Sequence, residues 1–197
     1  MYVKDHSRAN RGADLERLIR LANERYQHKR IAVITKQATE FIPLRGRNGK
    51  ITGAKVEHKA VSDFIGRYHQ FPIAIEAKNT NTDSIRFDAI QSHQADFLDA
   101  FTAERGTIGL VVVSFGMKRF HVVPWAFWQA AYNTRVRRGD RTARVTVSAF
   151  GQTWDIPPKY SVRESELNPL WRIPSHDPIF GFHYLKDAEK YVIDLGE

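Results

Sequence analysis

The stretch VSDFIGRYHQFPIAIEAKNT, residues 61–80, predicts two β-strands joined by a short polar connection at residues 69–70. In an extended strand, alternate side chains leave opposite faces of the sheet. Glu76 and Lys78 therefore share one face of the second strand. The other face carries apolar side chains that can pack in a core, namely Ile73, Ile75 and Ala77. The stretch thus predicts a core β-hairpin that carries an acid and a base on one side.

A second carboxylate lies close by if these two strands pair. Asp63 precedes Glu76 by thirteen residues, and a short turn brings the two side chains together. Neighbouring carboxylates repel each other unless a cation lies between them. Mg²⁺ binds few carboxylates and leaves its other positions to water and phosphate, and a lysine beside it can stabilise developing charge or orient an attacking water. These residues predict a site for phosphodiester hydrolysis. The alternative is that Asp63 caps a turn while Glu76 and Lys78 form a surface ion pair.

The charge of the chain is unevenly distributed. The formal net charge is +8 and the isoelectric point is about 9.8. Residues 1–60 hold 14 Lys and Arg against 6 Asp and Glu, whereas residues 61–197 hold 16 of each. This imbalance favours a polyanionic partner. A smaller arginine cluster at residues 133–144, NTRVRRGDRTAR, predicts a loop that either contacts the polyanion or keeps the protein soluble.

Composition limits the class of protein. A chain of 197 residues can bury one substantial core. No apolar run reaches about 18 residues and the N-terminus lacks the apolar stretch of a signal peptide. We therefore expect a cytoplasmic protein, or one in the host cytoplasm if the source is a virus, with no membrane partner. The absence of cysteine excludes disulfides and thiolate chemistry, and no histidines have the spacing of a zinc site.

The hydrophobic pattern predicts an α/β (α+β) domain with a central mixed β-sheet flanked by helices. The segments expected to form helices are residues 12–29, 85–106 and 125–133. The expected strands are residues 30–37, 58–68, 71–78, 107–115 and 118–124. Residues 43–55, PLRGRNGKITGAK, are glycine-rich and basic, which is typical of a projecting arm.

The last quarter of the chain has a weaker pattern. Five of the eight prolines lie between Pro157 and Pro178. We expect residues 1–145 to form the main domain and residues 146–197 to form an irregular C-terminal extension packed on it, with a final helical turn near residues 182–192.

The spacing of Asp63 and Glu76-Ala77-Lys78 resembles the PD-(D/E)xK nuclease superfamily, with Val61 or Ser62 at the proline position. More narrowly, the order of several segments resembles the RecU-type Holliday junction resolvases, from about Arg11 to about Trp128. These segments are RGADLERLI, IAVITK, the basic insertion, VSDFIG, PIAIEAK, SHQ and GLVVVSF.

The resemblance implies a restriction-endonuclease-like fold and a nuclease domain at residues 1–145. It implies a Mg²⁺-dependent endonuclease, with Mn²⁺ as a substitute, that resolves four-way DNA junctions by paired symmetric nicks in recombination and repair. A homodimer is implied, and recombination proteins remain open as further partners. Two alternatives stay open: a less selective or restriction-type nuclease, and a DNA-binding protein whose acid pair is structural.

The resemblance also assigns roles to residues. Asp63 and Glu76 would bind the metal, and Lys78 would be the catalytic lysine. Glu16 would be a further acid at the site, unless it is a solvated acid in the first turn of its helix. Gln94 would hydrogen-bond the water or the lysine, unless it is a partly buried structural glutamine.

Two basic segments would contact DNA. Residues 43–55 would be a stalk that enters the centre of the junction, and residues 1–12 a flexible basic arm. The residues expected to bind phosphate are Arg8 and Arg11 in the arm and Arg45, Arg47, Lys50 and Lys55 in the stalk.

Overall fold

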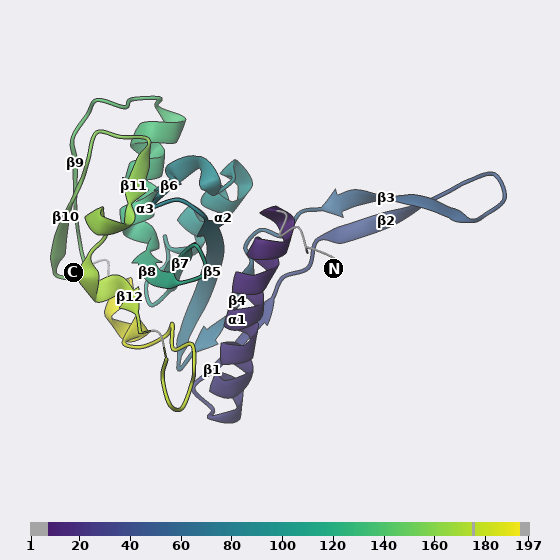
Figure 1. Cartoon of the computed structure of the whole chain (residues 1–197), viewed down its shortest axis with the longest axis horizontal. Coiled ribbons are helices and arrows are strands. Elements are labelled where there is room, and N and C mark those ends of the chain that lie inside the picture. Colours follow the sequence, from purple (N-terminus) through teal and green to yellow (C-terminus); the bar gives the residue numbers. More distant parts are fainter. Residues whose placement is uncertain (1–7, 175, 194–197) are drawn as a thin grey trace, which may run out of the picture.

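A six-stranded sheet lies at the centre of the protein, with the strands in the order β1-β4-β5-β7-β8-β12 (Figure 1). The structure, a computed structural model, describes residues 8–174 and 176–193, with side chains from residue 12 onward. The strands are Ala32–Lys36 (β1), Phe64–Tyr68 (β4), Phe71–Thr80 (β5), Ile108–Phe115 (β7), Arg119–Pro124 (β8) and Arg172–Ile173 (β12). Strands β5 and β7 are parallel, and the other neighbours are antiparallel. The predicted central mixed sheet is therefore confirmed.

The hairpin predicted from residues 61–80 is formed by β4 and β5, which pair from Tyr68 opposite Phe71 to Phe64 opposite Ile75. Strand β7, IGLVVVSF, is buried along its whole length, as expected of a strand with a parallel neighbour and both faces covered. Strand β4 approaches β1 so closely that a Cβ at Gly66 would lie 2.1 Å from the carbonyl oxygen of Val33. Only glycine fits this position.

Within the described residues, three α-helices pack around the sheet. They are Arg8–His28 (α1), Ser92–Phe101 (α2) and Trp125–Tyr132 (α3). Helix α1 contacts β1 and β5 through its buried side chains, which include Leu15 and Ile19, whereas α3 contacts β7 and β8. None of the helices among the described residues is both long and apolar enough to cross a membrane.

Helix α1 is longer than predicted. It begins at Arg8, so residues 8–12 of the expected flexible arm belong to the helix. The rest of that arm, residues 1–7, lies outside the described residues.

A second, two-stranded sheet projects from the molecule. It consists of Glu40–Arg45 (β2) and Ile51–His58 (β3), paired antiparallel, and it extends away from the central sheet (Figure 1). All of β2 and nearly all of β3 is exposed. This projecting hairpin contains the basic segment at residues 43–55 and is longer than that segment at both ends.

The helix predicted at residues 85–106 is wrong at both ends. Ser84–Arg86 forms a strand (β6), Phe87–Ala89 forms a 3₁₀ turn, and the α-helix spans only Ser92–Phe101. Its start is set by Gln91 and Gln94, each of which caps the backbone of the other. The apolar residues before the helix are buried instead by strand pairing, because β6 pairs with Ser161–Arg163 (β11).

The C-terminal extension is more regular than predicted. Val145–Ala149 (β9) and Gln152–Ile156 (β10) form a hairpin, β11 pairs with β6, and β12 joins the edge of the central sheet. The extension also contains 3₁₀ turns at Glu164–Glu166, Pro169–Trp171 and Ala188–Tyr191. Aromatic packing holds it in place, since the ring of Trp171 lies 5.1 Å from that of Phe127 on α3 and 5.3 Å from that of Trp154. The proline content of this segment suggested an irregular chain and gave no sign of this aromatic packing.

The expected loop at residues 133–144 is also partly helical. Asn133–Arg137 continues α3 as a π-helical turn. Arg135 is 1% exposed and donates hydrogen bonds to four backbone carbonyls, those of Asp140, Ala143, Pro157 and Lys159. Arg137 forms ion pairs with Asp96 and Asp99. Two of these arginines are therefore structural.

Candidate active site

The centre of the candidate site is Glu76, which is 0% exposed in the middle of β5. Its Oε1 accepts hydrogen bonds from Nζ of Lys78 at 2.6 Å and from Nε2 of Gln94 at 2.5 Å. The alternation of β5 places Glu76 and Lys78 on the same face, as predicted. Because Glu76 is fully buried, a surface ion pair is excluded.

Asp63 lies beside Glu76, where β4 begins. The backbone N–H of Ala77 donates to Oδ2 of Asp63 at 2.8 Å, and the N–H of Asp63 donates to Oε2 of Glu76 at 3.3 Å. Ser62 fixes the approach, because its buried Oγ donates to the carbonyl of Ile75 at 2.9 Å. Pairing of β4 with β5 therefore brings the two carboxylates together, as their spacing predicts.

Gln94 reaches the site from the first turn of α2. Its Oε1 accepts from Nζ of Lys78 at 3.2 Å and from the backbone N–H of Gln91 at 3.1 Å. The side chain is therefore a helix cap and a contact of the site at the same time. Its bond to Lys78 agrees with the first reading of Gln94, and its burial and cap agree with the second, while a role in catalysis stays a prediction.

Burial and neighbouring charge change the acidity of Glu76. Burial raises the pKa of Glu76 to about 8, an increase that Lys78 opposes and that Asp63 reinforces by charge repulsion. A divalent cation between the two carboxylates would offset both the desolvation and the repulsion, and would favour the ionised form.

The donor set fits Mg²⁺. Two adjacent carboxylates supply hard oxygen ligands, and Mg²⁺ usually keeps several waters and adds substrate phosphates to one or two carboxylates. Within residues 8–174 and 176–193, no cluster of three or more His, Asp or Glu side chains has the geometry of a metal site. Asp63 and Glu76 supply two carboxylates, which suits an ion shared with substrate.

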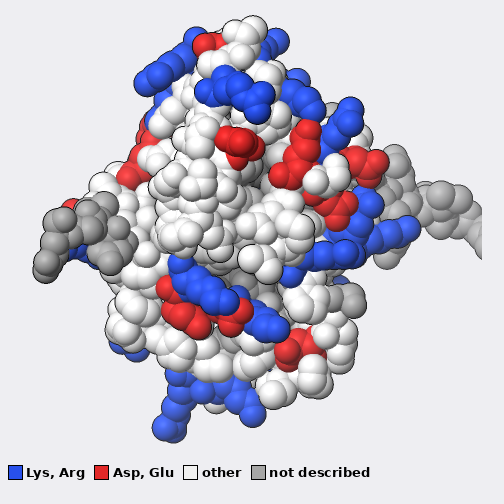
Figure 2. Space-filling view, turned by 90° about the vertical axis from the view of Figure 1, so that its left-hand side faces the viewer, with Lys and Arg blue, Asp and Glu red and all other residues white. Residues whose placement is uncertain are grey.

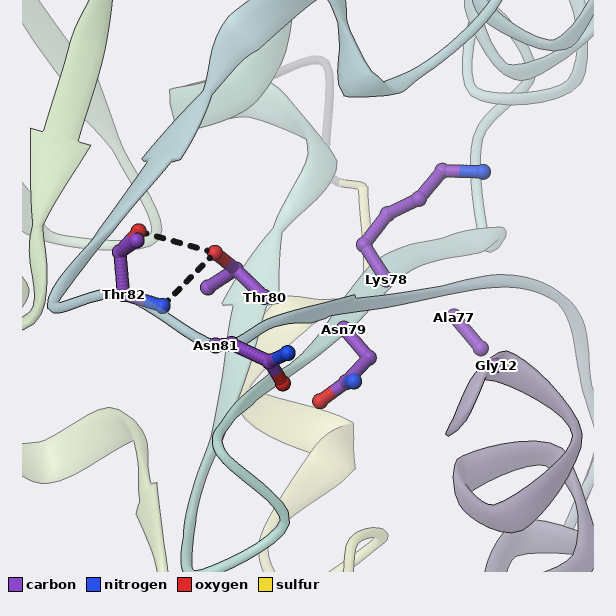
Figure 3. Close-up of a pocket in the computed structure, with 7 residues that line it drawn as sticks. All are labelled: Gly12, Ala77, Lys78, Asn79, Thr80, Asn81 and Thr82. Atoms are coloured by element: carbon purple, nitrogen blue, oxygen red, sulfur yellow. Dashed lines mark hydrogen bonds between the residues drawn. The ribbon is translucent and has the colours of Figure 1, made fainter. Parts of the chain in front are cut away.

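The site opens beside the end of β5. A cavity of about 420 Å³ is lined by Gly12 of α1 and by residues 77–82 (Figure 3). In Figure 3, Lys78 points away from Asn79 and Asn81, which extend from the opposite side of the chain. A ligand in this cavity would therefore lie next to the strand that carries both Glu76 and Lys78.

Glu16 lies close to this group without joining it. It forms an ion pair with Lys36, which pairs in the sheet with Phe64, the residue after Asp63. Because α1 begins at Arg8, Glu16 is two turns into the helix, so the reading of a first-turn acid is wrong. Lys36 was missed, because its contact with Glu16 depends on how α1 packs against β1.

The four predicted stalk residues lie in a different sheet from the strand that carries Glu76. Arg45, Arg47, Lys50 and Lys55 are exposed on the projecting hairpin, and Arg45 donates to the carbonyl of Gly49 at 3.0 Å. Arg8 and Arg11 lie in the first turns of α1, where the structure describes the backbone but not the side chains.

Comparison with known proteins identifies the family. Residues 10–156 match the family named recombination protein U (RecU). The Holliday junction resolvase RecU of Staphylococcus saprophyticus is 25% identical over 195 residues, which cover 95% of this chain and 84% of that protein. The Holliday junction resolvase RecU of Streptococcus sanguinis is 26% identical over 145 residues, which cover 70% of this chain and 71% of that protein. Hjc, a Holliday junction resolvase of Archaeoglobus fulgidus, has a TM-score of 0.39 and 15% identity, covering 78% of this chain and 88% of the Hjc chain. Because the family match spans about three quarters of its residues, the chain belongs to the RecU family.

Proposed function

We propose that this chain is a Holliday junction resolvase, a metal-dependent endonuclease that makes paired symmetric nicks in four-way DNA junctions. Membership of the RecU family supports the activity. The observation that carries the chemistry is the convergence of Lys78 and Gln94 on one oxygen of buried Glu76, with Asp63 beside it.

Asp63 and Glu76 would hold Mg²⁺, or Mn²⁺ in its place. When bound, such an ion supplies a Lewis acid that makes water more acidic and offsets the charge of the phosphate.

Lys78 and Gln94 have separate tasks in this proposal. The ammonium group of Lys78 lies near enough to the carboxylate to be positioned by it, and it stabilises negative charge on the phosphoryl oxygens as water attacks. Gln94 bonds both Lys78 and Glu76, so it fixes the relative position of the two. Attack in line with the leaving 3′-oxygen gives a 5′-phosphate and a 3′-hydroxyl.

Selectivity for junctions comes from the projecting hairpin and from pairing of subunits. The hairpin extends from the sheet and carries four exposed basic residues, so it suits a stalk that enters the centre of the junction, where phosphates converge. Arg8 and Arg11 add positive charge at the start of α1. A homodimer with two-fold symmetry matches the symmetry of the junction and places one site on each of two strands.

The test is cleavage of a labelled four-way junction and of a linear duplex of the same sequence in Mg²⁺, with Glu76→Gln and chelation of the metal as controls. We expect symmetric nicks in the junction, which both controls abolish. Equal cutting of duplex and junction would contradict selectivity for junctions, and an inactive wild-type protein in both Mg²⁺ and Mn²⁺ would contradict the nuclease.

A further inference from the structure

A second cavity adjoins Lys78 on the side toward the C-terminal extension. It has a volume of about 450 Å³, and its wall runs from Lys78 along the end of β5 to Arg86 and Asp88. A DNA strand with one phosphate at Lys78 would therefore place a neighbouring nucleotide in this cavity. The residues on the far side of the cavity, which include Arg86 and Asp88, would then contact that part of the strand.

Arg86 is fixed in position at that wall. Its Nε and Nη2 donate to the two carboxylate oxygens of Asp88 at 2.8 and 2.7 Å, and its guanidinium carbon lies 4.7 Å from the centre of the Tyr160 ring. Tyr160 completes the group, because its hydroxyl donates to Oδ2 of Asp88 at 2.9 Å. The side chain of Arg86 is nevertheless 65% exposed, and Asp88 occupies two of its five N–H donors.

A second arginine lies against the same ring. The guanidinium carbon of Arg141 is also 4.7 Å from the centre of the Tyr160 ring, so the two guanidinium carbons are no more than twice that distance apart. Arg141 is exposed, and basic side chains gather at the end of the molecule where its loop lies (Figure 2).

Buried Arg135 holds this arrangement in place. It bonds the carbonyls of Asp140 and Ala143 on either side of Arg141, and those of Pro157 and Lys159 just before Tyr160. The loop with Arg141 and the segment with Tyr160 are thus joined through one guanidinium group. Strand pairing adds a further link, since Arg86 lies opposite Ser161.

We propose that Arg86, Tyr160 and Arg141 form a second phosphate-binding site, which holds the DNA backbone next to the phosphate that is cut. This inference rests on the proposed function. Arginine suits the role because its planar fork of donors matches phosphate oxygens, and a fork held by a carboxylate and a ring loses little entropy on binding. Tyr160 lies beyond the residues that match the family, so the C-terminal extension contributes a contact to substrate.

The test is DNA binding by the full-length Glu76→Gln protein, which cannot cut its substrate in the proposed mechanism, measured over a series of salt concentrations. Arg141→Ala should weaken binding of the four-way junction several-fold and should lower the salt slope by about one. Tyr160→Ala should weaken binding to a similar extent, whereas Tyr160→Phe keeps the ring and should retain most of the affinity.

Arg67→Ala is the matched control, because Arg67 is an exposed arginine on β4 away from this cavity. If Arg141→Ala and Tyr160→Ala change affinity and salt slope no more than Arg67→Ala does, the phosphate site is wrong. A wild-type protein that binds DNA through Arg141 but does not cut junctions would support the phosphate site and contradict the proposed function. In the cleaving protein, Arg141→Ala should raise KM and leave kcat within about twofold.

Discussion

At the scale of single residues, the burial of Glu76 is unfavourable for the stability of the fold. A carboxylate that is 0% exposed loses its hydration, and here one oxygen accepts two side-chain hydrogen bonds in compensation. The nearby negative charge of Asp63 adds to the cost. An acid placed for structure alone would not be expected next to another acid in a sheet interior.

Glu76→Gln should therefore change the pH dependence of stability as well as abolish cleavage. The pKa of Glu76 is about 8 in the folded protein against 4.5 for a free side chain, so the folded state binds the proton more tightly. Its contribution to the free energy of unfolding then decreases as pH rises from about 5 to about 8. Without metal, the stability of Glu76→Gln relative to wild type should increase by about 1–3 kcal/mol across that range.

Chemical denaturation in the presence of a chelator at pH 5, 6, 7 and 8 measures this difference. Glu104→Gln is the matched control, because Glu104 is exposed. A difference between wild type and Glu76→Gln that stays constant with pH would contradict the raised pKa.

The proximity of Asp63, Glu76 and Lys78 could be predicted because their relation is local. Asp63, Glu76 and Lys78 lie on two strands joined by a short turn, so sequence spacing determines which side chains meet. The partner of Glu16 could not be predicted in the same way. Its ion pair with Lys36 depends on how α1 packs across β1, which no spacing in the sequence encodes.

At the scale of elements, the same distinction explains which segments were predicted correctly. Strands β7 and β8 have strong apolar runs and were found nearly to the residue. The start of α2 was misplaced because residues 85–91 were included in the helix. Only the pairing of β6 with the distant strand β11 makes Ile85 extended. The segment at residues 133–144 was predicted to be a loop of exposed arginines, because the sequence alone does not show that Arg135 is buried.

Arg135→Ala should destabilise the protein by about 3 kcal/mol, because it removes hydrogen bonds to four carbonyls in a buried place. Arg138→Ala, at an exposed arginine of the same segment, should change the free energy of unfolding by less than about 0.5 kcal/mol. Urea unfolding of both variants makes the comparison, and equal effects would show that Arg135 does not hold the loop.

At the scale of the whole molecule, the projecting hairpin and the central sheet are separate structures. Strands β2 and β3 pair only with each other among the described residues, while the carboxylates lie in the central sheet. Of the excess charge of +8 in residues 1–60, helix α1 and the hairpin each carry +2, and the rest lies on Lys29, Arg30, Lys36 and Lys59. Selectivity and chemistry should be separable by mutation.

Replacing residues 44–53 with Asn-Gly should shorten the hairpin and leave the fold intact, because this dipeptide suits a two-residue turn. We expect preference for the four-way junction over duplex to fall at least about tenfold, as the phosphate contacts of the hairpin are lost. Competition binding with both DNAs measures the preference, and circular dichroism checks the fold.

A second variant keeps the full-length hairpin but has Arg45, Arg47 and Lys50 changed to Gln. It tests whether the charge of the hairpin or its shape selects the junction. If the shortened protein still prefers junctions as strongly as wild type does, the hairpin is not the element that selects them.

Strand β12 has a further consequence for the molecule. By pairing with β8, it occupies hydrogen-bonding groups that would otherwise form an open sheet edge. Open edges recruit strands from other chains and lead to aggregation. The two residues Arg172–Ile173 therefore cover part of this edge. A chain cut before them would keep Asp63, Glu76 and Lys78 yet tend to precipitate as it accumulates in the cell.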